Sequence, residues 1–512
     1  MKLTFKPLAG LMLAATIAGA PLGATALAQA AAPAPASAAP AEAASAPAAA
    51  PAEAAPAPAA AAPTIEDKMD KGDNAWMLTS ALLVLLMILP GLALFYGGLV
   101  RSKNMLSVMM QVSTVALIGF VAWFLWGYSF AFTDGGSWDK FVGGLGRVFL
   151  NGVTPASNVA TFSTGVVIPE LTFIAFQSTF AAITAALVIG SLVERMKFAA
   201  IVAFAVLWPL LSYYPIAHMV WWWPGPNAIA LAPEDPVKSG LLWGFGALDF
   251  AGGTVVHINA GIAALVGALI LGKRQGYGKE PMPPHSLTLT LVGAGLLWVG
   301  WFGFNAGSNL ESNGYASLAI VNTFIATAGA GLSWILAEWV TRKKPSALGL
   351  ASGIVAGLVA VTPAAGFAGP MGALILGLVV SPICIIFCSV VKNALKYDDS
   401  LDAFGIHGVC GIFGALGTGL VVNPLWGGAG IVDYTTCGKD GDLSTCDALA
   451  SYEPIAQLLI QAKAVGVTVL WSAVASAIVF FIIKLVIGLR AAPEAEEDGL
   501  DISEHGERAY HS

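Results

Sequence analysis

Residues 252–267 read GGTVVHINAGIAALVG and residues 402–417 read DAFGIHGVCGIFGALG, and these two glycine-rich apolar stretches decide the fold. Each stretch contains one histidine, His257 or His407. An ionisable side chain at membrane depth is costly, so it usually faces a protected cavity or pathway. Two such histidines, one in each half of the chain, predict a pathway that both halves line.

The composition of the 512-residue chain excludes several classes of protein. It is 57% hydrophobic and 11% charged, with a mean hydropathy of +0.76, which is typical of multispan membrane proteins. The net charge of −7 and the scattered Lys and Arg exclude a basic nucleic-acid-binding surface. The sequence contains neither HExxH nor GxSxG, and its cysteines lack metal-ligand spacing. We therefore expect no enzymatic activity, no cofactor and no metal.

Eleven apolar stretches of the length that a membrane helix needs follow one another from residue 76 onward. The segment between the second and third stretches, residues 151–167, is expected to be a loop. The stretches cover approximately residues 76–99, 105–131, 168–193, 198–221, 249–271, 286–306, 316–340, 347–364, 370–392, 404–422 and 459–489.

Lys and Arg cluster on every second short connection between these stretches. By the positive-inside rule, the connections that carry them are cytoplasmic. Because eleven is an odd number of spans, the mature N-terminus then lies outside and the C-terminal tail inside. The clusters are Arg101 and Lys103; Arg195 and Lys197; Lys273, Arg274 and Lys279; Arg342, Lys343 and Lys344; and Lys392 and Lys396.

The N-terminus is typical of an exported protein. Lys2 and Lys6 precede a short apolar run, and Ala28-Gln29-Ala30 offers a cleavage site between small residues. The Ala- and Pro-rich sequence that follows predicts a disordered periplasmic segment. The expected parts are a signal peptide at 1–30, the disordered segment at 31–72, the membrane domain at 73–490 and a cytoplasmic tail at 491–512.

The two histidine stretches are weakly alike, because Asp249 precedes His257 and Asp402 precedes His407, each followed by Phe and Gly. Each stretch is the fifth span of its half if the halves are spans 1–5 and 6–10. Five spans per half place the second copy upside down in the membrane, and inverted repeats put a substrate path at their interface. The expected fold is an all-α integral membrane protein of eleven helices, with two inverted five-helix repeats and a final helix.

Cys437 and Cys446 share one polar loop. They are able to form a disulfide if that loop lies outside the cytoplasm, and the sequence leaves this open. The other cysteines lie in apolar stretches and are expected to pack as small hydrophobic residues: Cys384, Cys388 and Cys410.

Eight segments carry a resemblance to a known family: GLALFYGGLVRSKN (91–104), FQSTFAAITAALVIGSLVERMKF (176–198), PIAHMVW (215–221), GALDFAGGTVVHINAGIAALVGA (246–268), WFGFNAGS (301–308), VTPAAGF (361–367), DAFGIHGVCGIFGALGTG (402–419) and GLRAAPEAEEDGLDISEHGERAY (488–510). They resemble the ammonium transporter family, Amt/MEP/Rh, in order and at family spacing. The Trp after HMV and the Ser of NAGS place the chain nearer the Amt branch. The stretch at 222–248 looks longer than in compact bacterial members.

The resemblance implies that Trp221, Phe180 and Ser308 form an external recruitment site for ammonium. Aromatic faces replace part of the water shell of a cation, and a hydroxyl accepts from its N–H groups. Phe176 lies four residues before Phe180, on the same helix face, and is expected at this site. Phe180 and Phe304 are expected to stack as a gate that excludes water and bare ions.

Below this gate, the resemblance implies that His257 and His407 line the path. Two neutral imidazoles hydrogen-bonded to each other can hand protons along it. Asp249 is expected to cap the fifth span and to support the recruitment site. The acidic run at residues 398–402 is interpreted as a solvated cytoplasmic face.

The resemblance predicts a transporter or channel for ammonium in a bacterial inner membrane. Ammonium would bind outside and lose its proton, and ammonia would pass the histidines, with or without a relayed proton. Two alternatives stay open: an ammonium sensor that acts through a separate signalling partner, and a channel for a neutral gas.

The family also implies a homotrimer in membrane lipid. The resemblance to bacterial members further implies that a PII signalling protein docks on the cytoplasmic face, at the matching tail and the loops near Arg274 and Lys396.

Overall fold

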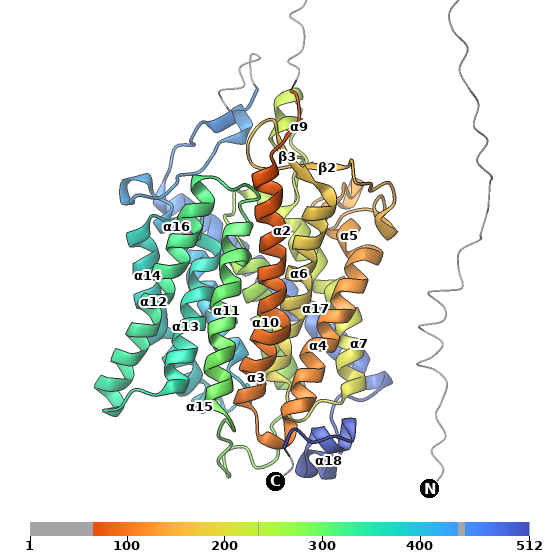
Figure 1. Ribbon diagram of the computed structural model, residues 1–512, viewed down its shortest axis with the longest axis vertical. Helices are drawn as coiled ribbons and strands as arrows, with labels where there is room; N and C mark the ends of the chain where they lie inside the picture. The colour runs from red at the N-terminus through yellow and green to blue at the C-terminus, as the bar shows by residue number, and fades with distance from the viewer. Residues whose placement is uncertain (1–64, 234, 439–445, 511–512) are drawn as a thin grey trace, which may run out of the picture. The chain divides into compact units, whose positions relative to one another are not determined.

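The computed structural model shows a bundle of long helices, with irregular segments gathered at two ends (Figure 1). It describes residues 65–233, 235–438 and 446–510. The expected signal peptide at 1–30 and residues 31–64 of the expected disordered segment lie outside the described residues. We call the end with β2, β3 and α9 the upper end and the end with α18 the lower end, as Figure 1 is oriented.

Eleven helices in the described part of the chain are long and apolar enough to cross a membrane, and each predicted stretch coincides with one. Those of the first half consist of α2 (Lys71–Leu86), η1 (Met87–Leu92) and α3 (Ala93–Leu99); η2 (Ser102–Asn104), α4 (Met105–Ala122), η3 (Trp123–Gly127) and α5 (Tyr128–Phe132); α6 (Glu170–Val188) and η6 (Ile189–Ser191); α7 (Phe198–Trp208), η7 (Pro209–Tyr213) and α8 (Tyr214–Trp221); and η9 (Gly253–Ile258) and α10 (Asn259–Leu271).

The second half repeats this arrangement and adds a final helix. Its spans are α11 (Leu287–Gly307); α12 (Gly314–Arg342); α13 (Ala347–Val361) with η10 (Thr362–Ala364); α14 (Pro370–Ile385), η11 (Ile386–Val391) and α15 (Lys392–Leu395); η12 (Phe404–Val409) with α16 (Cys410–Val421); and α17 (Pro454–Val486). The predicted fold class is confirmed: a multispan helical protein with two five-helix halves and an eleventh helix.

The segment before the third span differs from the prediction of a loop. It contains β2 (Asn158–Ala160) and β3 (Val166–Pro169), which pair antiparallel, and β1 (Lys68–Met69) joins β3 in parallel. The N–H of Lys68 donates to the carbonyl of Gly165 at 2.8 Å. Residues 68–72, expected to be disordered, are therefore ordered, because this pairing and the capping of α2 by Asp70 hold them.

Short elements complete both ends. At the upper end lie α9 (Pro226–Leu231), η4 (Gly136–Trp138), η5 (Val148–Leu150), η8 (Trp243–Phe245), η13 (Pro424–Trp426) and η14 (Tyr434–Thr436). At the lower end lie α18 (Pro493–Asp498) and η17 (Asp501–His505). The carboxylate of Asp501 accepts from the N–H groups of Leu106 and Ser107, at 3.1 and 2.7 Å, so the tail caps α4.

Buried ion pairs hold the lower end together. Arg274 bonds to Glu194 at 2.8 Å and to Asp398 at 2.9 Å, and Arg101 bonds to Glu194 at 3.0 Å. The interpretation of residues 398–402 as a solvated face is wrong, because Asp398 and Asp399 are each 1% exposed. Burial opposes ionisation of Asp398, but the hydrogen bond from Arg274 and the charge of Arg195 outweigh it and lower the pKa of that carboxyl.

The two histidine helices touch backbone to backbone, as the small residues in both stretches predict. A Cβ placed on Gly261 of α10 would lie 2.2 Å from the nitrogen of Gly408 in η12. The close approach brings spans five and ten together and positions the site between them.

Candidate functional site

His257 and His407 meet inside the bundle, as predicted. Their rings are stacked, with centroids 5.3 Å apart and planes 13° apart, and their Nδ1 atoms are 3.3 Å apart. Both side chains are buried, at 1% and 4% exposure. A hydrogen bond at this distance needs one N–H donor and one acceptor, so the pair shares a single proton between the two Nδ1 atoms.

The outward nitrogen of His257 points away from its partner. Nε2 of His257 is buried and has no hydrogen-bond partner among the described residues. Buried polar atoms are normally paired, so an unpaired one calls for an explanation. A ring nitrogen left free inside an apolar passage can exchange a hydrogen bond with a small polar molecule that passes it.

Each histidine sits in a π-helical turn that begins its span. His257 lies in η9, and His407 lies in η12. Gly252, directly before η9, has a φ of +109°, a left-handed conformation that side chains other than glycine rarely adopt. This turn lets the chain change direction sharply, so that the helix starts among buried residues of the bundle.

A buried carboxylate caps each of these turns. Asp249 accepts from the N–H groups of Gly252, Gly253 and Thr254, at 2.9, 2.5 and 2.8 Å, and from the hydroxyl of Thr254. Burial raises the pKa of this carboxyl, and the donors oppose that shift. The expected role of Asp249 as a helix cap is confirmed by these contacts.

At the lower end the cap is Asp399, not Asp402. Asp399 accepts from the N–H groups of Ala403 and Phe404, each at 2.9 Å. Asp402 instead binds the ammonium group of Lys392 at 2.6 Å. The sequence comparison paired Asp249 with Asp402 because of the Phe and Gly that follow each, yet Asp249 and Asp399 both stand eight residues before a histidine. That equal spacing was the signal that could have found Asp399.

We call residues 249–257 the upper histidine segment and residues 399–407 the lower histidine segment. Aromatic rings lead from the upper end of the bundle to the upper histidine segment. The ring of Phe180 contacts that of Trp221 edge-on, with centroids 5.9 Å apart, and stacks on that of Phe304 at 4.2 Å and 13°. The ring of Phe304 lies 6.0 Å from that of His257. The expected stack of Phe180 and Phe304 is confirmed, and both rings are fully buried.

The remaining predicted residues lie around this file of rings. The ring of Phe176 lies 4.9 Å from that of Phe180 and is fully buried, so it packs against the stacked pair of Phe180 and Phe304 rather than at the surface. The indole N–H of Trp221 donates to the carbonyl of Asp249 at 2.9 Å, which ties the ring to the upper histidine segment. The hydroxyl of Ser308 donates to the carbonyl of Phe304 at 2.8 Å, so its lone pairs stay available.

Trp301 is the site residue that the sequence reasoning missed. Its ring stacks on that of His257, with centroids 5.3 Å apart and planes 14° apart, and its N–H donates to the Thr362 hydroxyl at 2.9 Å. The ring therefore fixes the plane of His257. Its place in WFGFN, one helical turn before Phe304, was the signal available in the sequence.

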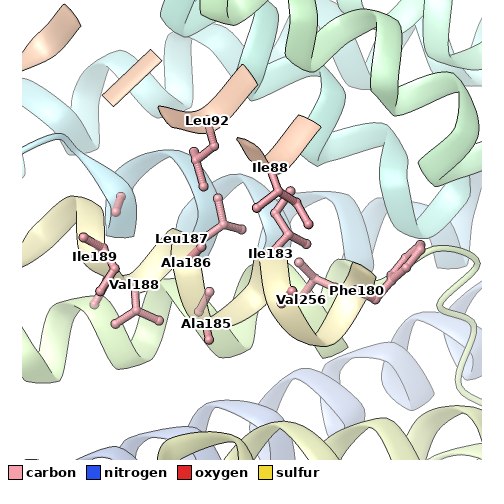
Figure 2. Close-up of a cluster of buried hydrophobic side chains, with 14 of the residues drawn as sticks. Ile88, Leu92, Phe180, Ile183, Ala185, Ala186, Leu187, Val188, Ile189 and Val256 are labelled. Carbon is pink, nitrogen blue, oxygen red and sulfur yellow. The ribbon is translucent and has the colours of Figure 1, made fainter. Parts of the chain in front are cut away.

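A narrow apolar cavity of about 10 Å³ adjoins the histidines, close to the size that one water-sized molecule needs. Figure 2 shows Ile183 and Leu187 of α6 facing Ile88 and Leu92 of η1, and three of these four side chains, Leu92, Ile183 and Leu187, line the cavity. The cavity is lined by Met87, Leu92, Phe95, Ile183, Leu187, Val256, His257, Leu297, Trp301, Phe304, Val355 and His407.

Comparison of the sequence with known proteins identifies the family to which the chain belongs. The sequence model of the Ammonium Transporter Family matches residues 75–510. The chain belongs to the ammonium transporter family. An ammonium transporter of Aquifex aeolicus is 45% identical over 446 residues, which cover 87% of this chain and 95% of that protein. An ammonium transporter of Bacillus subtilis is 41% identical, over 86% of this chain and 99% of that protein.

Solved structures agree with this family membership. Mep2 of Saccharomyces cerevisiae is 31% identical, with a TM-score of 0.70, over 83% of this chain and 88% of that chain. A sensor Amt protein is 29% identical, with a TM-score of 0.71, over 85% of this chain and 98% of that chain. These relatives are transport or sensor proteins by name, and none of the names denotes an enzyme.

Proposed function

We propose that this chain is an ammonium transporter or channel. It takes up ammonium at the Trp221 end, removes its proton, and conducts ammonia past His257 and His407, with or without a relayed proton. The observation that carries the proposal is the continuous file of rings from Trp221 through Phe180 and Phe304 to the two histidines.

The order of the rings supports a separation of capture from conduction. The face of Trp221 attracts a cation by about 0.5–2 kcal/mol, depending on how far the site is desolvated. The stacked pair of Phe180 and Phe304 then closes the path. A lone dehydrated ion in a low-dielectric passage costs on the order of tens of kcal/mol, so the cation releases its proton before it passes.

The histidines provide the polar contacts that a neutral amine needs beyond the gate. Nε2 of His257 is free to bond with the passing molecule, while the two Nδ1 atoms keep one proton between them. Because either ring can hold that proton, the pair also provides a step for proton relay.

We propose that the upper end faces the periplasm and the lower end the cytoplasm of a bacterial inner membrane. The Lys and Arg clusters lie on the connections expected inside. The disulfide between Cys437 and Cys446 lies in the loop before α17, on the side expected outside, where an oxidising compartment allows it to form. The N-terminus is then periplasmic and the tail cytoplasmic.

We also propose that three copies assemble in the membrane and that a PII-type signalling protein binds the lower end, as the family resemblance implies. Cross-linking in native membranes measures the first. Co-purification with a PII protein measures the second, and a variant that lacks residues 491–512 should weaken it.

The test of the proposed function is the charge movement that an ammonium pulse evokes on the purified protein in liposomes. A saturable current, absent from protein-free liposomes, is the expected result. His257→Asp, with His407 retained, should change the charge moved per ammonium. His285→Gln is the matched control, because His285 lies at the lower surface and bonds to the Val100 carbonyl and the Tyr510 hydroxyl.

The likeness to a sensor Amt protein favours a second candidate, an ammonium sensor. A sensor would bind ammonium with no sustained current and no change in internal pH. A neutral-gas channel would change the internal pH without any current. An internal pH dye in the same liposomes separates these outcomes from electrogenic transport.

A further inference from the structure

His218 is a buried histidine outside the conduction path. It lies in the last turn of α8, three residues before Trp221, and is 0% exposed. Both ring nitrogens face backbone carbonyl oxygens: Nδ1 lies 3.0 Å from that of Ala131, and Nε2 lies 2.7 Å from that of Asp139.

The number of N–H groups that these two contacts require decides which protonation state of His218 satisfies them. A carbonyl oxygen only accepts hydrogen bonds, so both contacts require an N–H on the ring. A neutral imidazole has one N–H, whereas an imidazolium has two. Only the protonated form of His218 therefore satisfies both contacts; the neutral form leaves one nitrogen lone pair facing a carbonyl lone pair.

The two carbonyls belong to the segment that covers the upper end of α8. Ala131 is in the last turn of α5, and Asp139 follows η4. A later stretch of the chain links this segment to α8 again, because Leu241 donates to the carbonyl of Lys140 at 2.9 Å and Leu242 donates to that of Met219 in α8 at 2.8 Å. His218 thus joins the ends of two spans and the loop beyond them.

The position of Trp221 depends on this junction. The ring of Trp222 stacks on His218, at 5.1 Å and 13°, so the residue next to Trp221 is held by the imidazole. Trp221 in turn bonds to Asp249 of the upper histidine segment. A shift of the last turn of α8 would therefore move the indole that lies above Phe180.

The carboxylates around His218 favour its protonated form, and none of those in the described part of the chain lies closer than 3.9 Å to the ring nitrogens. The carboxylate of Asp139 lies 3.9 Å from Nε2. Asp134 is near on the same loop, and its carboxylate is bound by Lys238 at 2.9 Å. Lys140, next to Asp139, is directed to the carbonyl of Ser239 at 3.1 Å.

We propose that His218 is a positioning residue of the recruitment site and that it acts only when protonated. The imidazolium donates to the carbonyls of Ala131 and Asp139 and thereby fixes Trp221. When the ring loses its proton, one of these two hydrogen bonds is lost. The external pH then determines how firmly Trp221 is held in position. The inference rests on the proposed recruitment of ammonium at Trp221.

The first test needs no substitution. Hydrogen exchange of the full-length protein is followed by mass spectrometry between about pH 5 and 8, corrected for the intrinsic pH dependence of exchange. The segment at 131–142 should lose about tenfold in protection as the pH rises, because one hydrogen bond to a charged donor is lost. Corrected protection that does not change with pH in this segment overturns the proposal, whatever the transport activity.

The second test is the pH profile of ammonium-evoked current for the parent protein, His218→Gln and His285→Gln. Glutamine donates to one carbonyl at every pH. In the parent, the half-saturating ammonium concentration should rise with external pH, while the maximal current changes little. His218→Gln should lack this step, and His285→Gln should keep it because a neutral ring satisfies its carbonyl and hydroxyl partners.

The outcomes separate the two proposals. No current in the parent at any pH contradicts the proposed function and leaves the exchange experiment to decide on His218. A current with an unchanged pH step in His218→Gln overturns the role of His218 alone. A uniform loss of current at every pH in His218→Gln identifies it as a structural residue only.

Discussion

The upper and lower histidine segments share a spacing, a capping aspartate and a π-helical turn, but their surroundings differ. The carboxylate of Asp249 accepts from backbone N–H groups and the Thr254 hydroxyl, and its carbonyl accepts from the indole of Trp221, whose ring contacts that of Phe180. Asp399 lies next to Asp398, whose carboxylate is bound by Arg274. The ammonium group of Lys392 donates to the backbone carbonyl of Asp399.

The difference shows that one local arrangement, a capping aspartate before a π-helical turn, stands in two different electrostatic surroundings. At the upper end the cap leaves its negative charge without a cationic partner among the described residues, beside aromatic faces that attract cations. At the lower end the carboxylates are surrounded by arginine and lysine, which neutralise the charge and hold the connections together. Under the proposed function, the upper copy of the motif would serve capture of the cation and the lower copy anchors the connections.

The largest expected effect comes from the proposed aromatic gate, the stack of Phe180 on Phe304 next to the upper histidine segment. Phe180→Ala should destabilise the protein by about 3–5 kcal/mol and open the path to water or other ions. Thermal unfolding and the selectivity of the current measure the two effects. Phe204→Ala is the matched control, because Phe204 is also fully buried and stacks on Phe480 at 5.2 Å and 14°. Equal loss of selectivity in both variants would contradict the gate.

Arg274→Ala tests the anchoring of the lower end. Glu194 and Asp398 would lose a buried cation, which costs about 3–5 kcal/mol in unfolding free energy. The exposed pair of Lys238 and Asp134 is the comparison, and Lys238→Ala should leave the free energy of unfolding nearly unchanged, because solvent screens that pair. A similar loss in both variants would remove the distinction.

The pH dependence of stability follows from the same pairs. Burial opposes ionisation of Glu194, but its hydrogen bond and charge contacts with Arg101 and Arg274 lower its pKa from 4.5 to about 2. Because the pKa is lower in the folded state, stability from Glu194 is present above pH 4.5 and lost as the pH falls towards 2. Acid unfolding in detergent should begin at higher pH in Arg274→Ala than in the parent.

A matched pair of substitutions compares the two caps directly. Asp249→Asn and Asp399→Asn both put an amide against N–H donors, so both should lower the unfolding temperature. Only Asp249→Asn should also raise the half-saturating ammonium concentration, by about tenfold, the ratio that 1.4 kcal/mol of lost attraction produces. An equal rise in both variants would mean that the caps act through the fold alone.

The smallest effect is expected from Cys437→Ser. The disulfide with Cys446 lies in an upper-end cluster with Ile229 and Ala230, away from the file of rings. Ammonium-evoked current should be unchanged within error, with or without a reducing agent. A large loss would assign the loop before α17 to the capture of ammonium.

The sequence was sufficient for the features that rest on hydrophobicity and short motifs. Every span was found because apolar runs of membrane length are unmistakable in a chain with few charges. The contact of His257 with His407, the stack of Phe180 on Phe304 and the cap of Asp249 followed from family motifs, and the structure contains all three.

The features that were missed depend on residues that meet only after folding. Glu194, Arg274 and Asp398 come from three separate connections, so their burial as ion pairs left no local pattern. The acidic run therefore looked like a solvated face. The sheet of β1, β2 and β3 was missed because its strands are two to four residues long, too short for an alternating pattern to emerge.

The contact between Gly261 and Gly408 has a consequence for how this sequence can change over time. Gly261 occupies a place where a side chain would run into the other half. A Cβ there meets the backbone nitrogen of Gly408 at 2.2 Å, so a smaller neighbouring side chain cannot compensate for it, whereas a Cβ on Gly408 meets the ring of Phe404 at 2.7 Å. The two halves can therefore diverge only around this one fixed position, and a comparison of many relatives should find Gly261 unchanged while its flanks vary.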